Sequence, residues 1–214
     1  MQPLTETSEG RLVGNGPPRP GPGRGFGVLF LVGGLLGLSA AVVLLVEKIA
    51  LIGNPDYIPT CSINPILSCG SVMETQQAEA FGIPNPIIGV AGFTAIAMVG
   101  AVLLAGAEFR QWFWLSLQAG ATFAVLFVHW LIYQSLYVIG ALCPYCMVVW
   151  AVTIPIFLHT TVYMLQRLRS SGISGSRSLV GLLTEYRAAM LTVWYLAVLA
   201  LIAHRFWDYW ITLV

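Results

Sequence analysis

The sequence predicts an all-α integral membrane protein: a four-helix transmembrane bundle core plus a fifth transmembrane helix, with a short outer-surface helix in the first extracytoplasmic loop. Hydrophobic residues make up 57% of the 214 residues and charged residues only 9%, which is far from the composition of a water-soluble domain. The net charge of +1, without a clustered basic face, excludes nucleic-acid binding as the main activity. Five apolar segments reach or nearly reach the length of about 20 residues that a helix needs to cross a bilayer. They are Phe26–Ile52, Ile87–Ala107, Trp112–Ile139, Pro144–Leu165 and Ala188–Trp207.

The segments outside these spans divide the chain into four parts. The stretch before the first span is rich in glycine and proline and cannot bury apolar surface, so residues 1–25 are expected to be a disordered cytoplasmic leader. Residues 26–165 form the four-helix domain and residues 166–187 a cytoplasmic linker. Residues 188–214 contain the fifth span and the C-terminus. The first apolar run is longer than the core of a signal peptide and is expected to be retained.

The basic residues predict the orientation, because Lys and Arg are held on the cytoplasmic side of a membrane. Eight of the ten basic residues lie before the first span, between the second and third, or between the fourth and fifth. The connections on the opposite side, Gly53–Pro86 and the short one near Gly140, contain none. We therefore expect the N-terminus in the cytoplasm and the C-terminus outside. The eight residues are Arg11, Arg19, Arg24, Arg110, Arg167, Arg169, Arg177 and Arg187.

The first outer connection is the one long polar segment, and its sequence predicts a helix. Ser71 and Glu74 have the spacing of a capping box, in which the two side chains satisfy backbone N–H groups at a helix start. Gly82 then provides a stop. We expect a short helix over about Val72–Phe81 on the outer membrane surface, with Cys69 just before its N-terminus.

The four cysteines all fall on the predicted outer side, although the orientation was derived from basic residues alone. Cys61 and Cys69 lie in the first outer connection, and Cys143 and Cys146 form Cys-Pro-Tyr-Cys before the fourth span. An extracytoplasmic compartment permits disulfides. Pro144 suits the first position of a helix, where unpaired N–H groups favour a thiolate at the preceding cysteine. Cys146 lies one turn deeper, within reach of a lipid-soluble electron acceptor.

Three interpretations of the cysteines compete: a redox relay, two structural disulfides, and a four-cysteine metal site. Structural disulfides leave the Cys-Pro-Tyr-Cys motif without a purpose. A tetrahedral metal site more typically uses two short-spaced pairs, whereas seven residues separate Cys61 from Cys69. The relay uses every cysteine and is favoured, with no metal. The alternative is a non-catalytic membrane scaffold or metal-handling protein with structural cysteines.

Three features together resemble the vitamin K epoxide reductase family: a loop cysteine pair, an asparagine before the second span, and a Cys-x-x-Cys at the head of the fourth. They are Cys61 and Cys69, Asn85, and Cys143 with Cys146. The sequence looks most like the bacterial homologues that act like DsbB, and the resemblance covers residues 27–165. It implies an inner-membrane enzyme that reoxidises a periplasmic DsbA-like thioredoxin-fold protein and reduces a quinone, either menaquinone or ubiquinone, in support of disulfide bond formation.

The resemblance also implies roles for the cysteines. Cys61 and Cys69 form a shuttle that exchanges with the partner protein and then with Cys143. Cys146 faces the quinone. Each exchange requires in-line approach of a thiolate to a disulfide sulfur, so the loop is expected to move.

Three further residues match quinone-site positions of the family. Asn85 matches the asparagine whose amide N–H can donate a hydrogen bond to a quinone oxygen. Thr75 matches a family residue with a hydroxyl, six positions after the second loop cysteine, and it retains that hydroxyl. In the vertebrate enzymes a tyrosine four residues after the last cysteine helps to bind the quinone, and the matching residue here is Trp150. Because an indole cannot do acid–base work, this difference from the family weakens the expectation of vitamin K epoxide reduction but not that of ordinary quinone reduction.

Five more positions in the spans carry expectations about packing. Gly33 and Gly37 have the spacing that allows close approach of two helices. His129 is expected to make a packing hydrogen bond rather than to carry protons. Glu47 and Lys48 are expected to snorkel to the membrane interface or, alternatively, to line the outer mouth of the quinone pocket.

Overall fold

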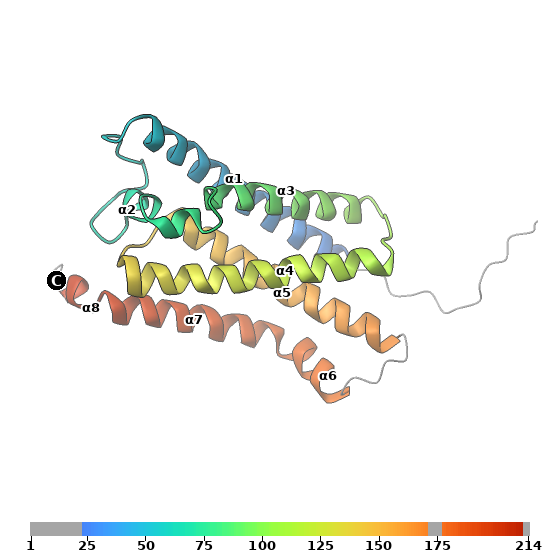
Figure 1. Ribbon diagram of the computed structural model, residues 1–214. Helices are drawn as coiled ribbons and strands as arrows, with labels where there is room; N and C mark the ends of the chain where they lie inside the picture. The colour runs from blue at the N-terminus through green and yellow to red at the C-terminus, as the bar shows by residue number, and fades with distance from the viewer. Residues whose placement is uncertain (1–22, 171–176, 212–214) are drawn as a thin grey trace, which may run out of the picture.

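The computed structural model of the chain describes residues 23–170 and 177–211 (Figure 1). Within these residues five helices are long and apolar enough to cross a membrane. They are α1 (Arg24–Gly53), α3 (Asn85–Leu104), α4 (Gln111–Tyr133) with its π-helical continuation η2 (Gln134–Ile139), α5 (Pro144–Ser170) and α7 (Arg187–Arg205). The shorter helices are α2 (Cys69–Met73), η1 (Gln76–Glu79), α6 (Arg177–Glu185) and α8 (Trp207–Ile211). The chain is therefore an all-α integral membrane protein, as the sequence predicts.

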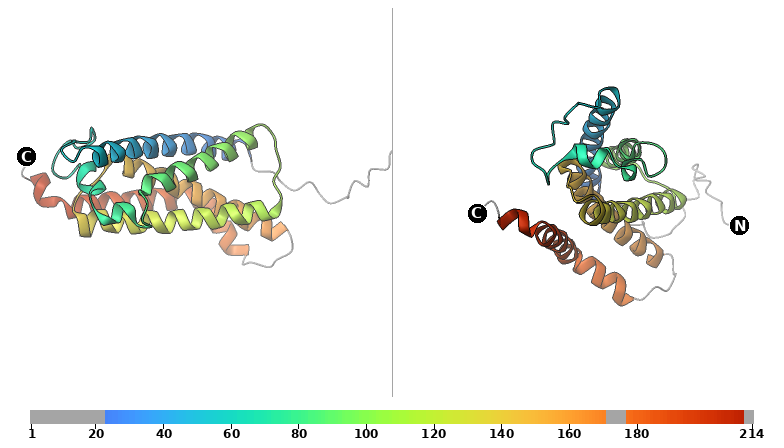
Figure 2. Two further views of the ribbon diagram at one scale, coloured as in Figure 1. Left: turned by 45° about the horizontal axis from the view of Figure 1, so that its top comes forward. Right: turned by 60° about the vertical axis from the view of Figure 1, so that its left-hand side comes forward.

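Helices α1, α3, α4 and α5 form a bundle, and α7 lies along one side of it (Figure 2). Helix α1 packs against α3 and α5, and α4 packs against α5. The short helices α2 and η1 gather at one end of the bundle, which we call the loop end (Figure 1). Arg24, Arg110 and Arg187 stand at helix starts at the opposite end.

Helices α1 and α3 approach closely because glycines line their contact. A Cβ atom added to Gly34 would lie 2.6 Å from a backbone nitrogen of α3, and one added to Gly100 would overlap the backbone of α1. A Cβ atom on Gly37 would overlap an aromatic ring of α3, whereas one on Gly33 would meet a side chain of α5 at 3.3 Å. The predicted close approach is confirmed, with Gly33 facing α5 rather than α3.

Proline creates the attachment point for α7. Pro155 lies inside α5 and has no N–H group, so the carbonyl of Ala151 loses its helical partner. The hydroxyl of Tyr195 on α7 donates to that carbonyl at 2.6 Å. A side chain of the fifth membrane helix thereby satisfies a polar group that would otherwise be unpaired in the bundle.

Two more hydrogen bonds join α7 to the bundle. The indole N–H of Trp194 donates to Nε2 of His129 at 3.0 Å, and Nδ1 of the same imidazole donates to the carbonyl of Val125 at 2.7 Å. His129 thus has the packing role that the sequence predicts. At the loop end, Nε of Arg205 donates to the carbonyl of Leu136 in η2 at 2.8 Å. Ile202 of α7 adds apolar packing to these polar contacts, in a cluster with residues of α4 and α5.

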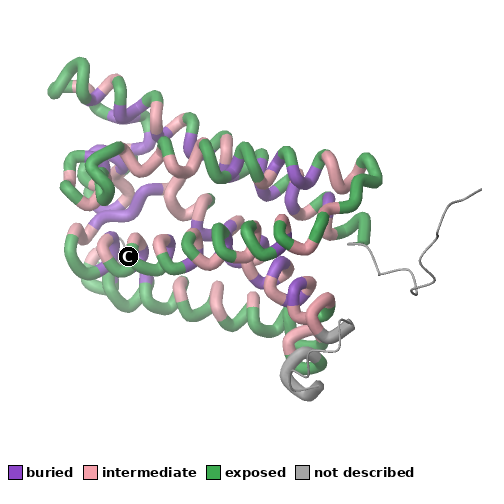
Figure 3. Tube along the Cα trace, turned by 45° about the vertical axis from the view of Figure 1, so that its right-hand side comes forward, coloured by how far each residue is buried: buried purple, intermediate pink, exposed green. Residues whose placement is uncertain are grey.

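Many residues along the helices are exposed (Figure 3), and large apolar side chains are among them. On α7, Val193, Leu196 and Leu199 are each more than half exposed. In a membrane these side chains contact lipid tails. Because the tails are as apolar as the side chains, no hydrophobic force drives these residues into the protein interior. The buried residues lie mainly on α1 and α5, at the centre of the bundle.

The structure describes only part of the predicted leader and linker. Residues 1–22 of the leader lie outside the described residues, and α1 already begins at Arg24. Within the predicted linker 166–187, α5 continues to Ser170 and α6 follows at Arg177. Residues 171–176 lie outside the described residues. The division of the chain into four parts therefore stays a prediction.

The predicted surface helix exists, but its bounds were wrong. Ser68, not Ser71, caps α2, because its hydroxyl accepts from the backbone N–H of Ser71 at 3.2 Å. Cys69 is therefore the first residue of the helix rather than the residue before it. Thr75 has extended backbone angles, and its hydroxyl donates to a carbonyl of α2 at 2.8 Å. The expected single helix is thus divided into α2 and η1.

Substitution of Gly100 tests the close packing of α1 on α3. Gly100→Ala should lower the melting temperature of the purified protein in detergent, because overpacking costs typically about 1–3 kcal/mol and the obstacle here is backbone. Gly92→Ala on the same helix is the matched control, since a Cβ atom there meets nothing within 4 Å. Alanine favours a helix by about 1 kcal/mol over glycine, so the control should melt at or above the parent temperature. Equal melting temperatures for both variants would contradict the packing.

Candidate redox site

Backbone pairing aligns the loop after α1 with the segment just before α5. The N–H of Leu142 donates to the carbonyl of Ile66 at 2.7 Å, and the N–H of Ser68 donates to the carbonyl of Leu142 at 2.9 Å. These bonds make one parallel β-bridge. Cys69 follows Ser68 and Cys143 follows Leu142, so the pairing brings the two cysteines together.

An asparagine turn shapes the loop before this bridge. The side-chain oxygen of Asn64 accepts from the N–H groups of Ile66 and Leu67 at 3.0 and 2.7 Å. The N–H of Ile63 donates to the carbonyl of Leu67 at 2.8 Å. Asparagine suits such a turn because its short side chain bonds the backbone two residues on.

The sulfurs of three cysteines are in contact. Cys61 and Cys69 form a disulfide, while Cys143 and Cys146 are free. The sulfur of Cys69 lies 3.0 Å from the sulfur of Cys143. Cys69 and Cys143 are completely buried, and Cys61 is 5% exposed. The structure therefore combines an oxidised loop pair with a reduced pair at the head of α5.

The same sulfurs also have the spacing of a metal site. Those of Cys61, Cys69 and Cys143 all lie within 4.8 Å of one another. A thiolate metal site needs each cysteine as a separate anion, whereas two of these three are joined in a disulfide. The arrangement in the structure is suited to thiol–disulfide exchange.

Cys143 caps α5 and its surroundings favour the thiolate. Its carbonyl accepts from the N–H of Met147 at 3.0 Å, and its sulfur lies 3.5 Å from the N–H of Cys146. The hydrogen bond from the Cys146 thiol, helped by the N–H groups of Cys146 and Tyr145, lowers the pKa of the Cys143 thiol in spite of its burial. A thiol with a lowered pKa is a better leaving group in exchange. The predicted position at the mouth of a helix is confirmed.

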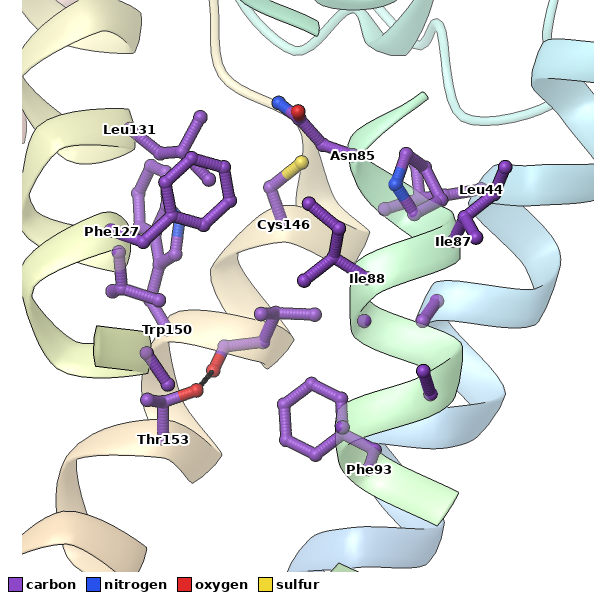
Figure 4. Close-up of a pocket in the computed structure, with 18 of the residues that line it drawn as sticks. Leu44, Asn85, Ile87, Ile88, Phe93, Phe127, Leu131, Cys146, Trp150 and Thr153 are labelled. Atoms are coloured by element: carbon purple, nitrogen blue, oxygen red, sulfur yellow. Dashed lines mark hydrogen bonds between the residues drawn. The ribbon is translucent and has the colours of Figure 1, made fainter. Parts of the chain in front are cut away.

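A cavity of about 760 Å³ lies between α3 and α4 and reaches the side of α5 (Figure 4). Its volume falls within the range of about 300–1,000 Å³ that ligand cavities occupy. Small residues on the two facing helices leave the space, and the remaining walls are largely aliphatic and aromatic. These small residues are Gly89, Gly92 and Ala95 on α3, and Gly120 and Ala124 on α4.

Cys146 and Asn85 lie at the same end of this cavity (Figure 4). The amide nitrogen of Asn85 donates to the carbonyl of Gln77 at 2.7 Å, and its oxygen accepts from the N–H of Ala80 at 3.1 Å. Asn85 therefore fastens η1 over the cavity, and one of its two amide hydrogens takes no part in these bonds.

Trp150, Thr75 and Gln134 also line the cavity. Trp150 is 2% exposed, and its indole N–H has no partner among the described residues. The hydroxyl of Thr75 is bonded to the loop backbone. Sequence reasoning missed Gln134, whose side-chain oxygen is buried and unpaired in the described structure. Its position depends on the π-helical turn η2, which no sequence signal marked.

Both expectations for Glu47 and Lys48 were wrong. The two residues are buried and neither lines the cavity. Lys48 donates to the carbonyl of Met73 at 2.7 Å, and Glu47 accepts from Thr60. A charged group can be buried only when it is paired or hydrogen-bonded, and here the loop supplies the partners that water would supply to a snorkelling side chain.

One comparison with known proteins bears on this site. A model of the vitamin K epoxide reductase family matches residues 28–161, which is more than half of the chain. The match includes all four cysteines and ends within α5, before α7. No curated relative matches the sequence.

Paired cysteine variants test which loop cysteine faces Cys143. With Cys61 and Cys146 both changed to serine, mild oxidation should join Cys69 to Cys143, because their sulfurs are already 3.0 Å apart. With Cys69 and Cys146 changed instead, Cys61 and Cys143 should pair slowly. Acid quenching, alkylation and peptide mass spectrometry measure both disulfides. Faster pairing of Cys61 than of Cys69 would disprove the observed alignment.

Proposed function

The chain belongs to the vitamin K epoxide reductase family of membrane thiol–disulfide oxidoreductases, and on that premise we propose that it oxidises a DsbA-like thioredoxin-fold protein and reduces a membrane quinone. The observation that carries the proposal is the continuous path of sulfurs. It runs from the loop disulfide through Cys143 to Cys146, which lines an apolar cavity. Such a path joins thiols on the water side to an oxidant within the bilayer.

The first step is exchange between the partner and the loop. A partner thiolate attacks Cys61, the Cys61–Cys69 bond breaks, and Cys69 leaves as a thiolate. The second partner thiol then attacks the mixed disulfide, so the partner is oxidised and the loop holds two thiols. We assign Cys61 to the partner because Cys69 is completely buried against Cys143.

The second step moves the electron pair to the head of α5. The Cys69 thiolate attacks Cys143 of an oxidised Cys143–Cys146 pair, and Cys146 leaves as a thiolate. Cys61 then attacks Cys69, which restores the loop disulfide and releases Cys143. The lowered pKa of Cys143 favours this release. After this step Cys61 and Cys69 are joined and Cys143 and Cys146 are free, the same pairing of cysteines as in the structure.

The third step is transfer to a quinone from the Cys143–Cys146 dithiol. Two thiols lose two electrons and two protons and form a disulfide, and the quinone becomes a quinol. The apolar cavity suits a lipid-soluble ring with an isoprenoid tail, and Cys146 is the cysteine that lines it. The amide hydrogen of Asn85 that the loop does not use, and the unpaired indole N–H of Trp150, are the donors we assign to the quinone oxygens. Thr75 contributes through the loop backbone that it holds over the cavity.

We place the redox site outside the cytoplasm of a bacterial cell, in the inner membrane. The helix-start arginines Arg24, Arg110 and Arg187 lie at the end of the bundle opposite the cysteines, and basic residues favour the cytoplasmic side. The site then faces the compartment in which disulfides persist. The reduced partner and the loop meet there.

Replacement of Cys146 tests the electron path. Cys146→Ala should reduce quinone-dependent thiol oxidation to background, because no thiol would face the cavity. The Cys61–Cys69 disulfide should still exchange with added thiols in this variant. Quinone absorbance measures the first activity, and alkylation followed by mass spectrometry measures the second. Full quinone reduction by Cys146→Ala would refute the proposal and favour structural cysteines.

A cavity-filling variant tests where the quinone binds. Ala95→Phe should raise the KM for a short-chain quinone analogue, because the added ring enters the cavity, while loop exchange with thiols is unchanged. Thr94→Phe is the control, since the neighbouring Thr94 is exposed and does not line the cavity. Equal KM values for the two variants would place the quinone elsewhere.

A further inference from the structure

Two adjacent residues near the loop end of α1 hold the two sides of the cysteine loop. Successive residues of a helix point about 100° apart, so Glu47 and Lys48 reach different segments. The Glu47 carboxylate accepts from Thr60, the residue before Cys61, through its hydroxyl at 2.5 Å and its backbone N–H at 3.4 Å. Lys48 donates to the carbonyl of Met73, the last residue of α2, at 2.7 Å. The disulfide lies between these two attachments.

Two further contacts complete the network. The ammonium of Lys48 forms an ion pair with Glu79 of η1 at 3.0 Å. The Glu47 carboxylate beside Tyr57 raises the pKa of the Tyr57 hydroxyl. Glu47 and Lys48 are only 6% and 8% exposed, so water cannot readily replace these partners. Loss of one partner leaves a buried charge poorly satisfied.

The closed loop is suited to one exchange and blocks the other. With Cys69 fully buried and Cys61 only 5% exposed, an external thiolate has little access to the disulfide sulfurs that it must reach in line. The same position holds Cys69 at 3.0 Å from Cys143, as internal exchange requires. The loop must therefore lift to meet a partner and return to reduce the centre.

We propose that Glu47 and Lys48, with their partners Thr60, Met73 and Glu79, form a latch that sets the balance between the closed and the lifted loop. The inference rests on the proposed function for the role of the loop. Glu47 and Lys48 are positioning residues, since neither touches a reacting sulfur or lines the cavity. Weakening the latch favours the lifted loop, so reaction with external thiols becomes faster and pairing of Cys69 with Cys143 becomes weaker.

Two measurements test the latch, and a weakened latch should change them in opposite directions. The variants change one latch residue on each side of the loop. The first is the rate at which glutathione reduces the Cys61–Cys69 disulfide in protein whose Cys143 and Cys146 are serine. The second is the equilibrium between glutathione and the Cys69–Cys143 disulfide in protein whose Cys61 and Cys146 are serine. Thr60→Val removes a hydrogen bond to the buried Glu47 carboxylate and should raise the first on the order of tenfold and lower the second by a similar factor. Glu79→Gln removes the charge that pairs with Lys48 at a side chain that is 42% exposed, so it should change both in the same directions by roughly two- to fivefold.

Control variants separate the latch from general damage to the loop. Glu74→Gln removes a carboxylate from the same loop that makes no side-chain contact in the described structure, and both measurements should stay at parent values. Thr60→Ser keeps the hydroxyl and should restore parent behaviour. Two results would overturn the latch: no change in either measurement, or a Glu74→Gln effect as large as that of Glu79→Gln.

Lys48 provides a direct probe of the same motion because it is the only lysine of the chain. A water-soluble amine-acylating reagent should label Lys48 slowly in the parent, on the order of tenfold faster in Thr60→Val, and roughly two- to fivefold faster in Glu79→Gln. Peptide mass spectrometry measures the labelling. Equal labelling in all variants would contradict the latch. None of these readouts uses a quinone or a partner protein, so the latch and the proposed function can fail independently.

Discussion

Two backbone hydrogen bonds between the loop and the segment before α5 determine where the sulfurs meet. Disulfide exchange requires sulfur atoms in near contact and in line, and the pairing of Ile66 and Ser68 with Leu142 provides that contact for Cys69 and Cys143. Ile66 and Leu142 are buried in one apolar cluster with residues of η2, α5 and α7. The membrane helices thus fix one cysteine, and the β-bridge brings the other to it.

Helix α3 packs tightly against α1 on one side and leaves a cavity toward α4 on the other. Toward α1 its Gly100 allows the two backbones to touch, which holds α3 on that side of the bundle. Toward α4 its Gly92 and Ala95 are too small to fill the gap, so a cavity remains beside Cys146. In a bilayer close packing of this kind has to supply the stability that the hydrophobic effect supplies in water. Helix α7 adds polar contacts instead, one of them at the carbonyl that Pro155 leaves unpaired.

The sequence predicted the membrane helices and the cysteines because the signals for both are local. Apolar length identifies a spanning helix, and Pro144 after Cys143 marks the start of α5. The surface helix was misplaced because Ser68 and Ser71 both have capping chemistry, and the β-bridge, a contact distant in sequence, favours the earlier start. Glu47 was misread for a related reason. Its position near a helix end suggests exposure, and only the folded loop shows that it is buried.

The central claim is that electrons pass between the loop pair and the quinone only through Cys143 and Cys146. Its most direct test is a stoichiometric one: the chain with all four cysteines reduced is mixed with a quinone analogue, quenched by alkylation, and assayed for disulfides and quinol. Two quinols should form per chain, the Cys143–Cys146 disulfide should appear before Cys61–Cys69, and no loop oxidation should occur when Cys143 is serine. Quinone-dependent formation of the loop disulfide in that variant would contradict it.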